Sequence, residues 1–469
     1  MGQRWKIILI GMIILLAIFS RFAFLDLRPL HHDEGVNYFF AEKIIRNGGW
    51  AYDPLNYHGP FYFFLLAFSF LILGINEFGL RFPAALFGVL LVLSPFCYKI
   101  GKEKERYLGS LFLLLSPSVF YYSRYSIHEV SFVFFSLMSV YFFSLILERR
   151  NLNYLPEFAL FLSAMLVSKE TAIIMLFALF IMGLVNFKRI KAIKFKENNK
   201  IILFSIVLFV FVYTAFFTNF FSNMQGFWDS FKGFMPWADR GLHEIGHDKP
   251  FYYYFILLLK YEWPILLLAL IGIFYFLRDR EKREKIFALN LVLWLILIFL
   301  IYSFIPYKTP WLIINVSVPM CFVAGIGFRR LEFKRIKWAL TFIGIIYLIV
   351  MSVYVNFVHP WQEDNDFAYV HTNKDILNLV GKINENYKEG DRILIVSEEY
   401  WPLPFYLHGK NVSYLDNERL YNYTDYNFFI LRDKIFNEED WRGYSYEEHE
   451  LRGGVELELI LRGRGLDLR

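Results

Sequence analysis

The stretch from residue 286 to residue 328 reads IFALNLVLWLILIFLIYSFIPYKTPWLIINVSVPMCFVAGIGF, and Lys308 is its only charged residue. Two apolar runs, 286–305 and 309–328, flank the short segment around Lys308. A helix needs about 20 mostly apolar residues to cross the hydrocarbon core of a bilayer. The stretch therefore predicts two membrane-spanning helices joined by a tight connection.

Similar apolar runs recur through the first three-quarters of the chain. We predict eleven spans, near 5–24, 82–98, 107–123, 128–147, 152–168, 170–187, 201–221, 263–277, 286–305, 309–328 and 337–358. Hydrophobic residues make up 57% of the 469 positions and aromatic residues 20%, with a mean hydropathy of +0.38. This composition excludes a disordered chain, a coiled coil and a disulfide-rich secreted domain. The two cysteines, Cys97 and Cys321, lie in apolar runs and indicate no disulfide framework.

Charge divides the chain into two parts and orients the first. Residues 360–469 carry 13 Lys and Arg against 22 Asp and Glu, whereas residues 1–359 carry 36 against 22. Of the basic residues in the connections, 24 fall on one alternating side and 10 on the other. The positive-inside rule makes the richer side cytoplasmic. We predict an integral plasma-membrane protein with a cytoplasmic N-terminus and no nucleic-acid partner, because the basic surplus marks cytoplasmic loops.

Residues 1–358 are thus predicted to form a polytopic α-helical membrane domain of about eleven transmembrane helices. Two long outer loops, 25–81 and 222–262, interrupt the spans. Each loop holds an apolar stretch, Phe61–Gly74 and Phe251–Leu259 respectively, that is short for a span and predicts an interfacial helix.

Residues 359–469 have ordinary composition and follow an odd number of spans. We predict that they form a soluble, extracytoplasmic α/β domain. The expected elements are a helix at 373–387, a turn or short helix at 401–407, and strands at 392–396, 412–415, 427–431 and 455–459, the last on an exposed edge.

The densest polar cluster, His31-His32-Asp33-Glu34-Gly35, follows the first span. Adjacent carboxylates beside imidazoles can supply a general base or ligands for a divalent metal ion. In the alternative interpretation, the segment is a solvated loop in which Asp33 caps a helix through Ile45. Polar residues near membrane depth are costly, which favours function, and both interpretations stay open.

Four further polar clusters lie between apolar runs on the predicted outer side. They are Tyr57–Phe61 with His58, Ser123–Glu129 with Arg124 and His128, Ser168–Thr171 with Lys169 and Glu170, and Pro306–Trp311 with Tyr307 and Lys308. A lysine between two prolines suits an anionic lipid headgroup. It can equally be a snorkelling lysine in an aromatic belt. The Tyr57–Phe61 cluster can instead be a Gly-Pro turn, and the Ser123–Glu129 cluster a self-satisfied interfacial ion pair.

One motif, His243-Glu244-Ile245-Gly246-His247, matches the HExxH pattern of zinc metalloproteases. That chemistry requires a stable helix that places both histidines on one face. Here the motif contains a glycine, lies in a polar loop and is followed by Asp248-Lys249-Pro250. We therefore expect an incidental match or a loop that closes over a site.

Taken in order across residues 1–358, these motifs resemble the GT-C membrane glycosyltransferases of the protein-mannosyltransferase and aminoarabinose-transferase type. The resemblance is carried by His32–Tyr38, His58–Tyr62, Arg81–Ala85, Ser123–Glu129 and Ser168–Glu170. It implies transfer of a sugar from a polyprenyl(dolichyl)-phosphate donor to a lipid-linked glycan or protein acceptor on the outer face. Glu129 departs from the family, which commonly has Asp there.

The resemblance also implies roles for individual residues. Asp33 and Glu34 would be the catalytic carboxylates, with Asp33 as the base, and the donor phosphate would meet Lys308, Arg124 and Lys169. A divalent ion is possible at Asp33, Glu34 and His58. Supporting or substrate-binding roles would fall to His32, Tyr38, His58, His128, Glu129, Glu170, Tyr307, His247, Trp401 and Tyr406, with the last two offering sugar-stacking rings.

A second resemblance is to an archaeal flippase-activity-associated family linked to N-glycosylation. It is carried by His31–Gly35, His247–Tyr253, Tyr307–Trp311, Tyr369–Thr372 and Glu399–Tyr406. Three functions therefore remain as hypotheses: a glycosyltransferase, a non-catalytic partner in the translocation of lipid-linked sugars, and an HExxH membrane metalloprotease, which the loop context disfavours.

Overall fold

The computed structural model describes residues 3–55, 58–97, 103–243, 247–278, 286–331, 334–415 and 425–461. Contacts between residues divide the chain into two compact units, which we call the membrane unit and the sheet unit. The membrane unit comprises Met1–Leu25 and Lys43–Val358, and the sheet unit comprises Asp26–Glu42 and His359–Arg469. Part of the predicted first outer loop, with the His31–Gly35 cluster, thus packs with the C-terminal residues.

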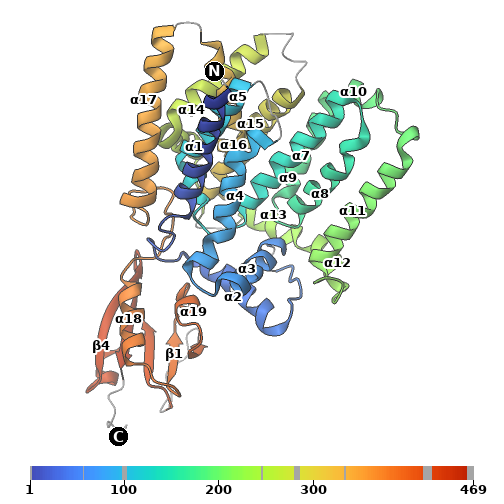
Figure 1. Ribbon diagram of the computed structural model, residues 1–469. Coiled ribbons are helices and arrows are strands. Elements are labelled where there is room, and N and C mark those ends of the chain that lie inside the picture. The colour runs from blue at the N-terminus through green and yellow to red at the C-terminus, as the bar shows by residue number, and fades with distance from the viewer. Residues whose placement is uncertain are drawn as a thin grey trace. The chain divides into compact units, whose positions relative to one another are not determined.

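Within the described residues, eight helices of the membrane unit are long and apolar enough to cross a bilayer. They are α1 (Gln3–Phe22), α4 (Glu77–Cys97), α7 (Glu129–Arg149), α11 (Asn199–Phe217), α14 (Tyr253–Arg278), α15 (Ile286–Phe304), α16 (Ile314–Arg330) and α17 (Lys334–Val353). In Figure 1 the long helices of this unit run side by side, with α17 on one flank and α11 on the other. The predicted polytopic helical fold is confirmed.

The other three predicted spans form shorter helices. The span predicted at 107–123 divides into α5 (Glu103–Leu115) and α6 (Pro117–Tyr122), because the Ser116 side chain caps α6 by accepting from the Val119 N–H. The spans predicted at 152–168 and 170–187 become α8 (Leu155–Leu166) and α9 (Ala172–Val185). The exact number of crossings therefore stays a prediction.

The first predicted interfacial stretch forms α3 (Phe61–Leu73), which ends where Gly74 takes φ = 80° and donates its N–H to Phe70. The second predicted stretch forms the first part of α14, which begins at Tyr253 and is separated from the rest of α14 by a kink. At the kink Glu262 has non-helical dihedrals, φ = −131° and ψ = 18°, and Pro264 follows. The interfacial position of this first part stays a prediction. A proline in a helix removes a backbone donor and favours a kink.

The remaining helical elements are short. They are α2 (His32–Asn47), whose residues up to Glu42 belong to the sheet unit and the rest to the membrane unit, and, in the membrane unit, α10 (Phe187–Lys191), α12 (Gln225–Lys232), α13 (Phe234–His243), η1 (Leu152–Tyr154), η2 (Lys196–Asn198), η4 (Pro310–Ile313) and the π-turn η5 (Tyr354–Val358).

The sheet unit is built on a five-stranded sheet of order β2-β1-β3-β5-β4. Strand β1 pairs in parallel with β2 and β3, and β5 pairs antiparallel with β3 and β4. The strands are β1 (Arg392–Val396), β2 (Asn411–Leu415), β3 (Phe428–Arg432), β4 (Ser445–Arg452) and β5 (Val455–Leu461), and the helical elements after residue 358 are α18 (Ile376–Asn386), α19 (Leu403–Tyr406) and η6 (Glu438–Trp441). The expected edge position of residues 455–459 was wrong, because the charged strand β4, which was not predicted, covers that side of β5.

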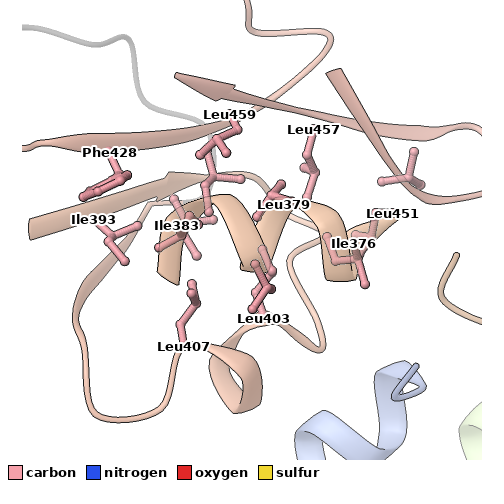
Figure 2. Close-up of a cluster of buried hydrophobic side chains, with 14 residues drawn as sticks. Ile376, Leu379, Ile383, Ile393, Leu403, Leu407, Phe428, Leu451, Leu457 and Leu459 are labelled. Carbon is pink, nitrogen blue, oxygen red and sulfur yellow. The ribbon is translucent and has the colours of Figure 1, made fainter. Parts of the chain in front are cut away.

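Both faces of the sheet are buried, which gives the unit two small cores. Helix α18 places Ile376, Leu379 and Ile383 on one side at helical spacing, where they pack against the sheet as Figure 2 shows. On the opposite face Leu394 and Phe429 pack with residues of the segment that follows β3. This accounts for the nearly continuous apolar character of β1 and β3.

Candidate functional site

The membrane unit holds a buried cluster of charged residues contributed by three distant segments. Lys169 Nζ forms an ion pair with Glu129 Oε1, and the two residues are 8% and 3% exposed. Glu129 is the first residue of α7, whereas Lys169 lies in the connection between α8 and α9. Burial of either charge without its partner would be costly. The ion pair therefore favours the buried position of both side chains.

A second pair lies beside the first. His58 Nδ1 lies 3.7 Å from Glu170 Oε2, and the His58 ring stacks on His128 with the centroids 4.9 Å apart. The backbones of His58 and Lys169 also form a β-bridge. Gly59 permits this approach, because a Cβ there would lie 2.4 Å from the Val167 carbonyl oxygen.

Several polar atoms of this cluster are buried without a hydrogen bond. They are His128 Nε2, Glu170 Oε2 and Thr171 Oγ1. Buried polar groups are normally satisfied, so such a concentration is typical of a site that receives a polar ligand or ordered water. The structure thus brings together five of the predicted residues: His58, His128, Glu129, Lys169 and Glu170.

Arg124 lies in the same loop but directs its guanidinium to the end of α1. Its Nη1 donates to the carbonyl oxygens of Ser20 and Ala23 at 2.9 and 2.5 Å, and its Nη2 donates to that of Phe24 at 2.7 Å. These bonds satisfy the carbonyls that the end of a helix leaves open. The geometry therefore gives Arg124 a helix-capping role, and its predicted contact with phosphate stays a prediction.

The predicted residues around Lys308 form a separate group. Lys308 Nζ donates to the carbonyl oxygens of Lys249, at 3.0 Å, and Ile305, while its backbone N–H donates to that of His247. The His247 and Tyr307 rings lie with their centroids 4.9 Å apart. Burial lowers the pKa of the Lys308 ammonium. This group joins the start of α14 to the end of α15.

His247 is also the last residue of the HExxH motif, so its conformation determines whether that motif can bind zinc. Helix α13 ends at His243, residues 244–246 lie outside the described residues, and His247 is not helical. The two histidines therefore do not share a helix, which the metalloprotease chemistry requires. Among the residues that the structure describes, no group of three or more His, Cys, Asp or Glu is arranged to hold a metal ion. The possible ion site at Asp33, Glu34 and His58 stays a prediction.

In the sheet unit, the His31–Glu34 motif forms the first turn of α2. The Glu34 carboxylate accepts the His31 N–H at 3.1 Å, and His31 Nδ1 accepts the Asp33 N–H at 3.0 Å. This reciprocal arrangement is a capping box in which His31, rather than Asp33, is the N-cap. Since Nδ1 accepts, the neutral ring donates from Nε2 to the Tyr369 carbonyl, 2.9 Å away.

Burial explains the protonation state of both histidines. Desolvation lowers the pKa of His31 to about 3, assisted by the neighbouring His32 and Arg452. Desolvation, followed by the charge of Arg452, lowers the pKa of His32 to about 4. Arg452 is buried and donates to the Trp401 carbonyl at 2.6 Å. Arg452 was not predicted as a site residue, because it lies on β4, a strand that was not predicted either.

Helix α2 packs on the segment around α19. Leu30 donates its N–H to the Tyr406 hydroxyl at 2.8 Å, and the Tyr38 hydroxyl bonds His408 Nδ1 at 2.7 Å. The His32 and Trp401 ring centroids are 6.1 Å apart. Within this unit the structure thus brings together the predicted residues His32, Asp33, Glu34, Tyr38, Trp401 and Tyr406.

Comparison with known proteins relates this architecture to a family and to solved structures. Residues 57–216 match the family of dolichyl-phosphate-mannose-protein mannosyltransferases, and this range includes the buried cluster of the membrane unit. The crystal structure of ArnT from Cupriavidus metallidurans bound to undecaprenyl phosphate superposes with a TM-score of 0.74 at 12% identity, covering 100% of both chains. Its apo state gives a TM-score of 0.69 at 12% identity, covering 97% of both chains. The chain has a GT-C glycosyltransferase fold.

Two uncharacterized proteins of Aquifex aeolicus (strain VF5) are also similar in sequence. One is 27% identical over 382 residues, covering 77% of this chain and 86% of its own length. The other is 26% identical over 308 residues, covering 64% of this chain and 59% of its own length. The resemblance to the archaeal flippase-associated family stays a prediction beside these GT-C similarities.

Proposed function

We propose that this GT-C protein transfers a sugar from a polyprenyl-phosphate donor to a lipid-linked glycan or protein acceptor on the outer face of the membrane. The observation that carries the proposal is the buried cluster of His58, His128, Glu129, Lys169 and Glu170, which lies within the range that matches the mannosyltransferase family. The undecaprenyl phosphate bound to the similar ArnT supports the donor class.

The reaction that we propose needs a base and a cation. An acceptor hydroxyl attacks the anomeric carbon, its proton passes to the Asp33 carboxylate, and the bond between the anomeric carbon and the phosphate oxygen breaks. The electron pair leaves with the polyprenyl phosphate. The Lys169 ammonium, directed by Glu129, would stabilise the charge that develops on this phosphate.

Two features of the chain support these assignments. Asp33 lies on the first turn of a helix whose cap is fixed by His31 and Glu34, so its backbone position is well defined. Lys169 has three N–H donors, of which Glu129 accepts one. The remaining donors suit phosphate oxygens, which a lysine binds as a point charge.

The test is a transfer assay with the full-length protein in lipid nanodiscs. A panel of radiolabelled polyprenyl-phosphate mannose, glucose and pentose donors is incubated with lipid-linked glycan and peptide acceptors. We expect release of polyprenyl phosphate from at least one donor, lost in Asp33→Asn and retained in Glu42→Gln, a control on the same helix. Undiminished transfer by Asp33→Asn would overturn the role of the base. Folded protein that accepts no donor would instead favour the translocation hypothesis.

We further propose that the N-terminus is cytoplasmic and that residues 359–469 are a soluble extracytoplasmic domain. The bias of Lys and Arg toward one set of connections supports this orientation. Protease added to intact cells should remove the C-terminal part and leave an N-terminal epitope protected. Protection of the C-terminal part would reverse the orientation.

A further inference from the structure

Helix α12, which the proposed transfer reaction does not use, lies at the end of the membrane-spanning helix α11 (Figure 1). The chain reverses just after α11, where Asn219, Phe220 and Phe221 take φ values of 50°, 52° and 69°. Left-handed dihedrals are costly for residues other than glycine, so tertiary contacts must hold this reversal in place. One such contact joins the hydroxyls of Tyr213 on α11 and Ser230 on α12, which are 2.9 Å apart.

The side chains of α12 form a buried face and an apolar, exposed face. Gly226 and Ser230 are buried, and a Cβ on Gly226 would collide with the backbone at the end of α11. Met224, Trp228 and Phe231 follow one another at helical spacing, so they share the opposite side of the helix. Each of these three side chains is more than half exposed. Helix α12 thus turns a stripe of apolar side chains outward.

A polar strip borders this apolar face, and its charges pair with each other. The Asp229 carboxylate accepts from Gln225 Nε2 at 3.0 Å and from Lys232 Nζ at 2.7 Å. A helix with an apolar face, a polar strip and low net hydrophobicity is typical of a segment that lies in the plane of a membrane interface. Because Asp229 and Lys232 neutralise each other, attachment to a membrane would depend on the apolar face and not on anionic headgroups.

The apolar face of α12 continues the surface that α11 turns toward lipid. Only 22% of the span that contains α11 is buried, and Phe211 on α11 is exposed. The Phe211 ring contacts the ring of Phe221, which is also exposed, with the centroids 5.5 Å apart. An apolar surface that continues a lipid-facing helix fits acyl chains better than water. We propose that α12 lies in the bilayer interface at the C-terminal end of α11, with Met224, Trp228 and Phe231 inserted among the acyl chains.

Tyr52 connects the inserted helix to the buried cluster. Gly233, the C-cap of α12, lies so close to Tyr52 that a Cβ on Gly233 would collide with the Tyr52 hydroxyl. Tyr52 is itself buried, and its ring packs edge-on against Phe217 at the end of α11, with the centroids 4.9 Å apart. Burial, followed by the charge of Glu170, raises the pKa of the Tyr52 hydroxyl. A fixed position of α12 in the interface would thus hold Tyr52 in place beside the cluster.

The test is spin labelling of the full-length protein in phosphatidylcholine nanodiscs, in a background with Cys97→Ala and Cys321→Ala. Labels at Trp228→Cys and Phe231→Cys probe the apolar face, and a label at Gln225→Cys is the matched control on the polar strip. Oxygen collects among acyl chains, whereas a nickel chelate stays in water, so we expect the ratio of oxygen to nickel collision rates to be about threefold higher at 228 and 231 than at 225. Equal ratios at the three positions would overturn the proposal. Labels at 228 and 231 that neither reagent reaches would overturn it in favour of a protein partner.

A second measurement needs no cysteine variant and tests the dependence on lipid charge. Phosphatidylcholine with brominated acyl chains should quench the fluorescence that the wild type shows in excess of Trp228→Phe, a substitution that keeps the apolar face. This quenching should persist when about a third of the lipid is replaced by phosphatidylglycerol, because the polar strip neutralises its own charges. An unquenched difference would place Trp228 in water and contradict the proposal. Quenching that appears only with the anionic lipid would reject the apolar face as the cause of insertion.

Discussion

The two polar regions of the chain use their charged residues in opposite ways. In the membrane unit, residues far apart in sequence pair with one another, as Lys169 does with Glu129. In the sheet unit, the side chains of His31 and Glu34, from a run of four polar residues, accept backbone N–H groups at the start of their own helix. A dense polar motif in sequence can therefore be a helix cap, and scattered single charges can form the buried cluster. Substitutions in the buried pair and in the helix cap should therefore differ in how strongly they destabilise the fold.

The largest effect should come from breaking the buried pair in the membrane unit. Lys169→Met leaves Glu129 buried without its partner and should lower the free energy of unfolding by about 3–5 kcal/mol. The double variant Lys169→Met with Glu129→Leu should recover most of this loss, because no uncompensated charge remains. Denaturant unfolding in micelles measures both quantities.

A matched control uses an ion pair that is exposed. Lys194 contacts Glu197 at 3.0 Å, and their side chains are 75% and 65% exposed. Lys194→Ala should therefore change the free energy of unfolding by less than about 0.5 kcal/mol. Equal losses in the single and double variants at 169 and 129 would show that packing, not charge, dominates the cluster.

The second effect is a dependence on pH that belongs to the sheet unit. The folded pKa values of His31 and His32 are lowered to about 3 and about 4, whereas an unfolded histidine titrates near 6.5. The unfolded chain thus binds more protons below pH 6.5, so stability is present above that pH and is lost as the pH falls toward 4. Each histidine should cost up to about 1.4 kcal/mol per pH unit in this window.

Variants at His32 isolate this effect from other titrating groups. His32→Gln should reduce the loss of stability between pH 6.5 and 5 by about half, since only His31 then remains. The measurement is the difference in unfolding free energy between the two pH values for each protein. A slope unchanged by the substitution would assign the pH dependence to groups outside the cap.

How far the sequence predicts these regions depends on the range of the interactions. Apolar run length predicted the long helices, and a short apolar run predicted β1 at its observed bounds, because both signals are local. Strand β4 was missed, since an exposed edge strand with the sequence SYEEHELR has the composition of a solvated loop. Arg452 lies on β4 and was therefore missed as well. Its charge lowers the pKa values of His31 and His32, which lie more than 400 positions earlier in the sequence.

The site was predictable as a set of residues but not as a set of contacts. His58, Lys169 and Glu129 stood out because charges are rare among apolar runs, yet nothing in the sequence says which of them pair. Arg124 shows the converse case, since its role depends on three carbonyl groups at the end of α1 that any residue would supply. The type of a residue does not indicate which distant residue it pairs with or which backbone groups it contacts.

A smaller effect separates Glu34 from Asp33. Glu34→Ala removes the acceptor for the His31 N–H and should cost about 1–2 kcal/mol of stability. Glu34→Gln should restore most of it, because glutamine also completes a capping box. Asp33→Asn should abolish sugar transfer while the protein still inserts and folds. Loss of transfer in Glu34→Gln with full stability would instead make Glu34 a catalytic residue.

The smallest effect concerns Tyr406, which can stabilise the sheet unit or stack on a sugar. Tyr406→Phe keeps the ring but removes the hydroxyl that accepts the Leu30 N–H, and should lower the unfolding free energy by about 0.5–1.5 kcal/mol. KM for the sugar donor should not change, because the stacking surface is intact. Tyr444→Phe is the control, since that hydroxyl makes no hydrogen bond among the described residues. If Tyr406→Phe instead raised KM and left stability unchanged, the hydroxyl would contact substrate.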